Sequence, residues 1–146
     1  MLTVEPQVIE RYVRPGAVRL LFRDVLNHGE RSERTSEAAI AAGLQGQFWR
    51  MHELLFNEQD TVAATAPSEL VALLRSFAAR LDGLDGATFA AQLESRAALP
   101  SLKAADAEQR KRGINSQPIF QIGTQRLVGY QSVEAMARAL DAALKG

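Results

Sequence analysis

Few residues in this chain of 146 have side chains able to carry out chemistry. The sequence contains no cysteine, so disulfides, thiolate catalysis and zinc–thiolate sites are excluded for these residues. The two histidines, His28 and His52, could in principle be metal ligands or an acid–base pair, because imidazole does both. Neither has Asp, Glu or His neighbours at ligand spacing, and His52 lies on the apolar face of a predicted helix. We therefore predict a structural role for His52, no role for His28, no metal site and no catalytic residue.

A second informative stretch is the polar loop GINSQPIFQIG, from Gly113 to Gly123, which enters a short strand through Gln117-Pro118. A cis bond before the proline would free one strand edge for β-type pairing, and it costs only about 0.5–1 kcal/mol relative to trans. A trans proline is equally compatible with these residues, because the first residue of a strand can lack its N–H without harm. The residues alone leave both forms open.

The remaining motifs have ordinary structural explanations. Phe48, Trp49 and Phe56 could line a ligand pocket, but aromatic residues at helical spacing are more often core residues, and we predict core positions. The basic run in Glu108–Gly113 ends a helix, where the helix dipole favours Lys and Arg. The sequence has no glycine-rich phosphate loop, nucleophile elbow or paired-carboxylate spacing.

Composition indicates a single globular domain without nucleic-acid or membrane partners. Seventeen Lys and Arg balance seventeen Asp and Glu, which argues against a broad charged footprint for nucleic acid or an anionic membrane. No apolar run approaches the ~18 residues that a membrane-spanning helix needs. The N-terminus has neither a basic start nor a long apolar segment, so it does not predict a signal peptide, and taken literally it places the chain in the cytoplasm.

Hydrophobic periodicity and turn residues predict the order helix, strand, helical block, hairpin, helix. The expected elements are a helix opened by Pro6, a strand at about 18–24, helices within about 32–112, two strands PIFQI and QRLVG joined at Gly123-Thr124, and a last helix capped by Ser132. The Thr/Ala-rich stretch before Pro67 is expected to be a loop. This order predicts an α/β or α+β layer fold, a single domain over residues 1–146 with a helical insertion at about 32–112.

Four segments resemble, in the same order, the DsbA-like branch of the thioredoxin superfamily. They are YVRPGAVRLLFRDVLNHG, AAIAAGLQGQFWRMHELLF, ADAEQRKRGINSQPIFQIG and LVGYQSVEAMARAL. The second is the most specific, and together they cover nearly the whole chain. The resemblance implies a DsbA-type thioredoxin-like fold and the thiol–disulfide oxidoreductase function of that family.

The resemblance also implies a substrate-binding site. Its residues would be Ser116, Gln117, Pro118 and Ile119, with a cis proline, although Gln117 stands where the family usually has Thr or Val. The family's first strand and its C-x-x-C motif have no counterpart, so we expect the first strand of the fold to be missing and the chain to begin after the redox motif. Dithiol exchange needs an attacking thiolate, and we therefore expect the chain to be inactive in it.

Whether the protein is an enzyme stays open at this point, because three hypotheses remain. The chain could be a DsbA-like oxidoreductase without its redox motif, or a cysteine-free module that holds an extended peptide or protein segment at the proline loop. The third hypothesis is a glutathione-dependent isomerase or transferase of the kappa-like group, which shares the fold and needs no C-x-x-C. We expect no cofactor.

Two further expectations follow from the resemblance. The missing strand is central in the family, and its absence would leave strand edges unpaired, which predicts a homodimer through edge pairing or strand exchange. The family is mostly exported, whereas this N-terminus reads as cytoplasmic, so the compartment stays open.

Overall fold

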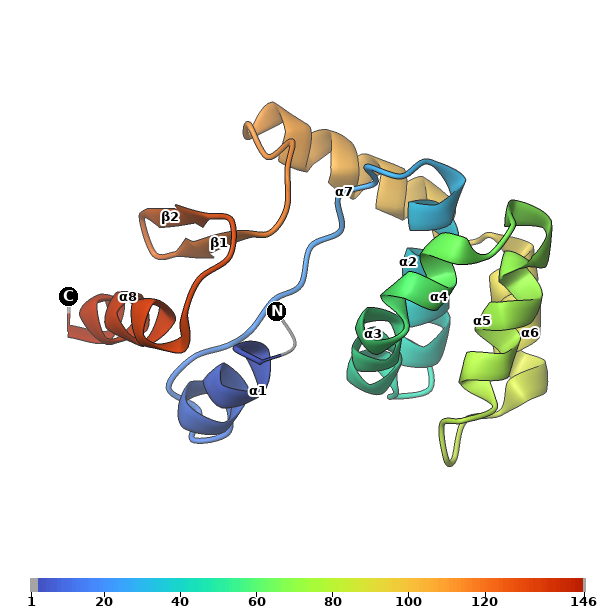
Figure 1. The fold of residues 1–146 in the computed structure, drawn as a ribbon, viewed down its shortest axis with the longest axis horizontal. Coiled ribbons are helices and arrows are strands. Elements are labelled where there is room, and N and C mark those ends of the chain that lie inside the picture. The colour runs from blue at the N-terminus through green and yellow to red at the C-terminus, as the bar shows by residue number, and fades with distance from the viewer. Residues whose placement is uncertain (1–2, 146) are drawn as a thin grey trace. The chain divides into compact units, whose positions relative to one another are not determined.

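The computed structural model describes residues 3–145, which divide between two compact units. We call Asp24–Lys111 the helical unit, and Met1–Arg23 together with Arg112–Gly146 the hairpin unit. Figure 1 follows the chain through its elements from blue to red. The assignment of residues 1–146 to a single domain stays a prediction.

The helical unit consists of helices joined by short turns (Figure 1). They are α2 (Glu30–Gly43), α3 (Phe48–Asn57), α4 (Gln59–Ala64), the 3-10 turn η2 (Pro67–Glu69), α5 (Leu70–Ala78), α6 (Gly86–Ser95) and α7 (Leu99–Lys111). Across residues 3–145, no helix combines the length and the apolar character needed to cross a membrane.

Small side chains on α2 allow the surrounding helices to pack closely. Ala38 and Ala42 are completely buried, and they belong to one core with Met51 of α3, Leu74 of α5 and Phe89 of α6. Full burial of a Leu, Met or Phe side chain stabilises a fold by roughly 1.5–3 kcal/mol. The alanine-rich segment is therefore the close-packing helix that the sequence predicts.

A buried carboxylate ties α2 to the end of α6. Glu37 is only 2% exposed and forms ion pairs with Arg34 at 3.6 Å and with Arg96 at 3.3 Å. Arg96 also pairs with Glu33 at 2.7 Å, and Lys103 contacts the same Glu33 at 3.2 Å. Burial works to raise the pKa of Glu33, but the hydrogen bonds from Arg96 and Lys103 outweigh it and hold that pKa below its ordinary value.

The hairpin unit combines segments from both parts of the chain. Its elements are α1 (Glu5–Val8), the π-helical segment η1 (Ile9–Val13), β1 (Ile119–Ile122), β2 (Gln125–Val128) and α8 (Val133–Lys145). Tyr12, Met136 and Leu140 are buried in its core, and the partly buried Phe120 and Leu127 of the hairpin pack against them. This combination of helices with a small sheet agrees with the predicted α+β fold class.

The hairpin and the following helix form where the sequence predicts them. β1 and β2 are antiparallel, with Ile119 opposite Val128, and Gly123 in the turn between them has φ of +56°, a conformation that glycine adopts without strain. Ahead of α8, the Ser132 hydroxyl accepts a hydrogen bond of 3.2 Å from the Ala135 N–H, which is the expected N-cap.

The strand expected at about 18–24 is not present in the structure. Residues 18–26 run as irregular chain, and Leu21 is 56% exposed. A strand needs a neighbour to complete its backbone hydrogen bonds, and the only sheet in the described residues is the pair β1–β2. Farther along this segment, the Leu26 N–H donates to Asp106 Oδ1 at 2.9 Å instead of to a strand. Apolar composition alone was therefore a misleading indicator of a strand.

The prediction of a loop before Pro67 is also wrong in part, because this stretch contains most of the helix α4. Val62 is buried in the helical core, so this short segment gains stability from packing that its composition does not reveal. Glu58, the residue before the first turn of α4, forms an ion pair with Arg80 at 2.6 Å.

Candidate functional site

The four residues predicted to bind substrate form one continuous segment leading into β1. The Gln117-Pro118 peptide bond is cis. Ser116 and Gln117 are exposed, while Pro118 and Ile119 are half-buried. The structure therefore places the segment at the surface of the hairpin unit, and its role in binding stays a prediction.

The hydrogen-bond pattern of the hairpin determines which backbone groups of β1 point outward. The Gly129 N–H donates to the Pro118 carbonyl at 2.9 Å, so these two residues occupy a hydrogen-bonded position of the ladder. Such positions alternate along an antiparallel pair, which makes Ile119–Val128 and Gln121–Arg126 the non-bonded pairs. The N–H and C=O groups of Ile119 and Gln121 consequently point away from β2, along the free edge of β1.

The free edge of β2 is different, because a side chain occupies one of its outward acceptors, the Val128 carbonyl. The Gln131 amide Nε2 donates to the Val128 carbonyl at 3.1 Å and to the Gly129 carbonyl at 3.2 Å. An occupied acceptor on an edge strand discourages further strand pairing at that point. On β1, no hydrogen bond from another described residue reaches the outward backbone groups of Ile119 or Gln121. The edge of β1 therefore has all four of these outward groups available to an incoming strand, whereas the edge of β2 has one acceptor occupied.

Arg126 reaches across the hairpin from β2. Its Nε donates to Gln121 Oε1 at 3.3 Å, and its Nη1 donates to the Arg112 carbonyl at 3.2 Å. These two contacts hold the guanidinium over β1, at the start of the loop that precedes Pro118. Sequence reasoning overlooked this residue, although a single arginine within an otherwise uncharged hairpin was a visible signal.

Apolar side chains lie exposed beside the same segment. Val128 is 63% exposed and Tyr130 is 70% exposed. Val128 stands directly opposite Ile119, so both side chains project from the face of the hairpin that also carries Gln121 and Arg126. This face offers apolar contact together with one cation.

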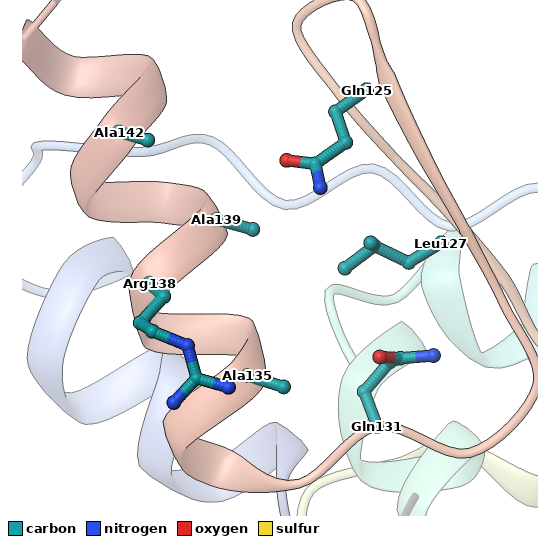
Figure 2. Close-up of a pocket in the computed structure, with 7 residues that line it drawn as sticks. All are labelled: Gln125, Leu127, Gln131, Ala135, Arg138, Ala139 and Ala142. Carbon is teal, nitrogen blue, oxygen red and sulfur yellow. The ribbon is translucent and has the colours of Figure 1, made fainter.

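A groove separates β2 from α8 on the opposite face of the hairpin (Figure 2). Its volume is about 380 Å³, and its lining residues are Gln125, Leu127, Gln131, Ala135, Arg138, Ala139 and Ala142. Figure 2 shows Leu127 pointing toward α8, where the short alanine side chains leave the space unfilled. None of the four predicted site residues lines this groove.

Both histidines belong to the helical unit, whereas the proline loop belongs to the hairpin unit. His52 is 5% exposed and lies between Phe48 and Phe56, with ring centroids 5.9 Å and 4.7 Å away, which agrees with a structural role. The backbone N–H of His28 donates to Ser32 Oγ at 3.0 Å in the turn before α2. Residues 3–145 contain no group of three or more side chains that could hold a metal ion.

Of Phe48, Trp49 and Phe56, all predicted as core residues, only Phe48 packs against the helical core, where it is partly buried. Trp49 is 42% exposed and contacts Phe48 edge to face at 5.2 Å. A helix presents only one stripe to the core, and residue 49 lies at the margin of the stripe that contains Met51 and His52.

A half-buried acid, Asp24, lies near His52 in the helical unit. Ser36 Oγ donates to Asp24 Oδ1 at 2.5 Å. Burial raises the pKa of Asp24 above its ordinary value, while the hydrogen bond from Ser36 and the charge of His52 act in the opposite direction. The hydrogen bond from Ser36 joins α2 to the segment before it.

Comparison with known proteins gives a match over nearly the whole chain. The model of a protein family described as thioredoxin matches residues 2–142. The chain is also similar to two curated proteins. It is 31% identical over 142 residues to Na(+)/H(+) antiporter NhaA 3 of Salinispora tropica, which covers 93% of this chain and 20% of that protein. It is 33% identical over 112 residues to Na(+)/H(+) antiporter NhaA 1 of Salinispora arenicola, covering 76% of this chain and 16% of that protein. The chain thus spans a fifth or less of the length of these relatives.

Proposed function

Because this chain belongs to the thioredoxin family, we propose that it is a DsbA-like member that holds an extended peptide or protein segment along β1 and the loop Ser116–Ile119. The sequence contains no cysteine, and thiol–disulfide exchange needs an attacking thiolate. In this proposal the residues of the chain do not carry out dithiol exchange, and binding is their function.

The open edge of β1 is the observation that carries the proposal. The N–H and C=O groups of Ile119 and Gln121 point away from β2, and no other described residue bonds to them. An isolated two-stranded hairpin is only marginally stable, and an added strand completes the hydrogen bonds of its edge. A peptide in extended conformation can bond to all four of these backbone groups, while its side chains alternate between the two faces of the hairpin.

Amide hydrogen exchange with and without a peptide tests this function. The probe is an eight-residue peptide of alternating valine and glutamine, with Gly-Ser at each end for solubility. We expect the peptide to slow exchange at the Ile119 and Gln121 amides, because it accepts hydrogen bonds from them. The Phe120 amide is the internal reference, since it lies at a position already bonded to β2. Binding without protection at Ile119 and Gln121, or no binding at all, would contradict the proposal.

The same edge supports a homodimer when no peptide is bound. Two copies of β1 can pair antiparallel about a two-fold axis, because each offers the same outward groups of Ile119 and Gln121. Sedimentation velocity over a concentration series measures the association. We expect dimers at high concentration that dissociate when the alternating peptide is added. A stable monomer at all concentrations would exclude the dimer and leave peptide binding to its own test.

A further inference from the structure

We propose that the β1 edge selects extended segments that carry a carboxylate side chain, and that Arg126 recognises it. This inference rests on the proposed peptide-binding function and adds a substrate class to it. The preferred segment has an acidic residue beside Gln121 and an apolar residue two positions away, beside Ile119.

The position of the guanidinium supports this assignment. Arg126 starts on β2, but its hydrogen bonds to Gln121 Oε1 and to the Arg112 carbonyl draw it over β1. A strand added to β1 would lie about 4.8 Å beyond it. A side chain opposite Gln121 would project from the same face of the sheet, where a Glu or Asp carboxylate can reach the guanidinium.

The charges of the segment favour an acidic partner. From Arg112 to Gln131 the only charged residues are Arg112 and Arg126, so the loop and hairpin carry two positive charges and no carboxylate. Arg126 forms no ion pair with another described residue; its two contacts use Nε and Nη1 and are made to neutral oxygens. Arginine and carboxylate form strong, often bidentate hydrogen bonds, and Nη2 of Arg126 remains available for one.

The apolar half of the preference comes from the residues around Ile119. Ile119 is half-buried, and Val128 opposite it is 63% exposed on the same face. Residues of a bound strand that are two positions apart lie on one face of the sheet. An acidic residue beside Gln121 therefore places the next residue of that face against Ile119 and Val128, where an apolar side chain buries surface.

A set of three labelled peptides tests the selectivity by fluorescence anisotropy. The peptides alternate valine with glutamate, glutamine or lysine, and they share the same Gly-Ser ends. We expect the glutamate peptide to bind roughly threefold to fivefold more tightly than the glutamine peptide at low salt, the range of an exposed ion pair, and the lysine peptide to bind more weakly than both. Added salt should reduce the affinity for the glutamate peptide and leave that for the glutamine peptide nearly unchanged.

Two variants assign the selectivity to a residue. Arg126→Gln should bring the affinity for the glutamate peptide down to that for the glutamine peptide, and unchanged affinity for the glutamine peptide shows that the edge is still formed. Arg138→Gln, which removes an equal charge from α8, should retain the full preference. The inference is overturned if the wild-type chain binds the glutamate and glutamine peptides equally, or if Arg126→Gln keeps the full preference for glutamate. Either result leaves the proposed binding function standing. If none of the three peptides binds, both proposals fail.

Discussion

The Tyr12 hydroxyl donates a hydrogen bond of 2.8 Å to Asp141 Oδ1, and this bond joins η1 to α8 across a sequence separation of 129 residues. Tyr12 is 7% exposed and belongs to the core of the hairpin unit together with Met136 and Leu140. The hydrogen bond with Asp141 is the main reason why the pKa of Tyr12 is raised, with burial and the negative charge of Asp141 adding to it. The N-terminal helical segment is thus anchored to the helix that follows the hairpin.

Tyr12→Phe should destabilise the chain, because it removes this bond while keeping the aromatic ring in the core. We expect a lower urea midpoint, measured by circular dichroism, with no change in helix content under native conditions. Tyr130→Phe is the matched control, since Tyr130 is 70% exposed. Equal midpoints for the two variants would show that the bond to Asp141 contributes nothing to stability.

Arg96→Ala should be more destabilising than an equivalent change at an exposed ion pair. Its partner Glu37 is 2% exposed and would keep only the longer contact with Arg34. Leaving a buried carboxylate so poorly paired costs about 2–3 kcal/mol. Arg75→Ala, which breaks the exposed pair with Glu94, should cost less than about 1 kcal/mol. Urea unfolding of both variants provides the comparison, and similar losses would contradict a special role for Glu37.

Asp24→Asn should alter the dependence of stability on pH. Burial raises the pKa of Asp24, so the folded state binds the proton more tightly than the unfolded state does. The free energy of unfolding therefore falls as the pH rises through the interval between the unfolded and folded pKa values. Because asparagine does not ionise, we expect the variant to be the more stable protein at neutral pH and to lose this advantage below about pH 4.

Urea midpoints of wild type and Asp24→Asn, measured at neutral pH and again below about pH 4, test this expectation. Asp60→Asn, at an exposed position of α4, controls for the general change in net charge. An advantage of Asp24→Asn that is the same at both pH values would show that ionisation of Asp24 is not its cause.

Gln121→Pro should weaken peptide binding, because it deletes an N–H donor on the open edge of β1. Gln121→Ala keeps that N–H and loses the same side-chain contacts, so the difference between the two variants isolates the backbone group. We expect the proline variant to bind the alternating valine–glutamine peptide roughly threefold to tenfold more weakly than the alanine variant, the range for one hydrogen bond. Anisotropy titration measures both affinities, and equal values would place the peptide elsewhere on the chain.

Local patterns were sufficient to predict much of the fold. The hairpin followed from a glycine between two apolar runs, and the last helix followed from Ser132 and its periodic apolar residues. Signals of this kind act within a few residues of each other. The segment at about 18–24 and the helix α4 were predicted wrongly because their structure depends on distant partners, a neighbouring strand for the first and the buried contacts of Val62 for the second.

The sequence by itself determined that this chain has no thiol chemistry, where its hairpin turns, and which four residues lead into β1. Only the tertiary structure decided that Gln131 bonds to the Val128 carbonyl on the edge of β2, that the edge of β1 stays open, and that Arg126 lies over β1. The physical reason is that composition and turn geometry are local properties. The open edge of a sheet and the position of a long side chain depend on contacts between residues that the fold brings together.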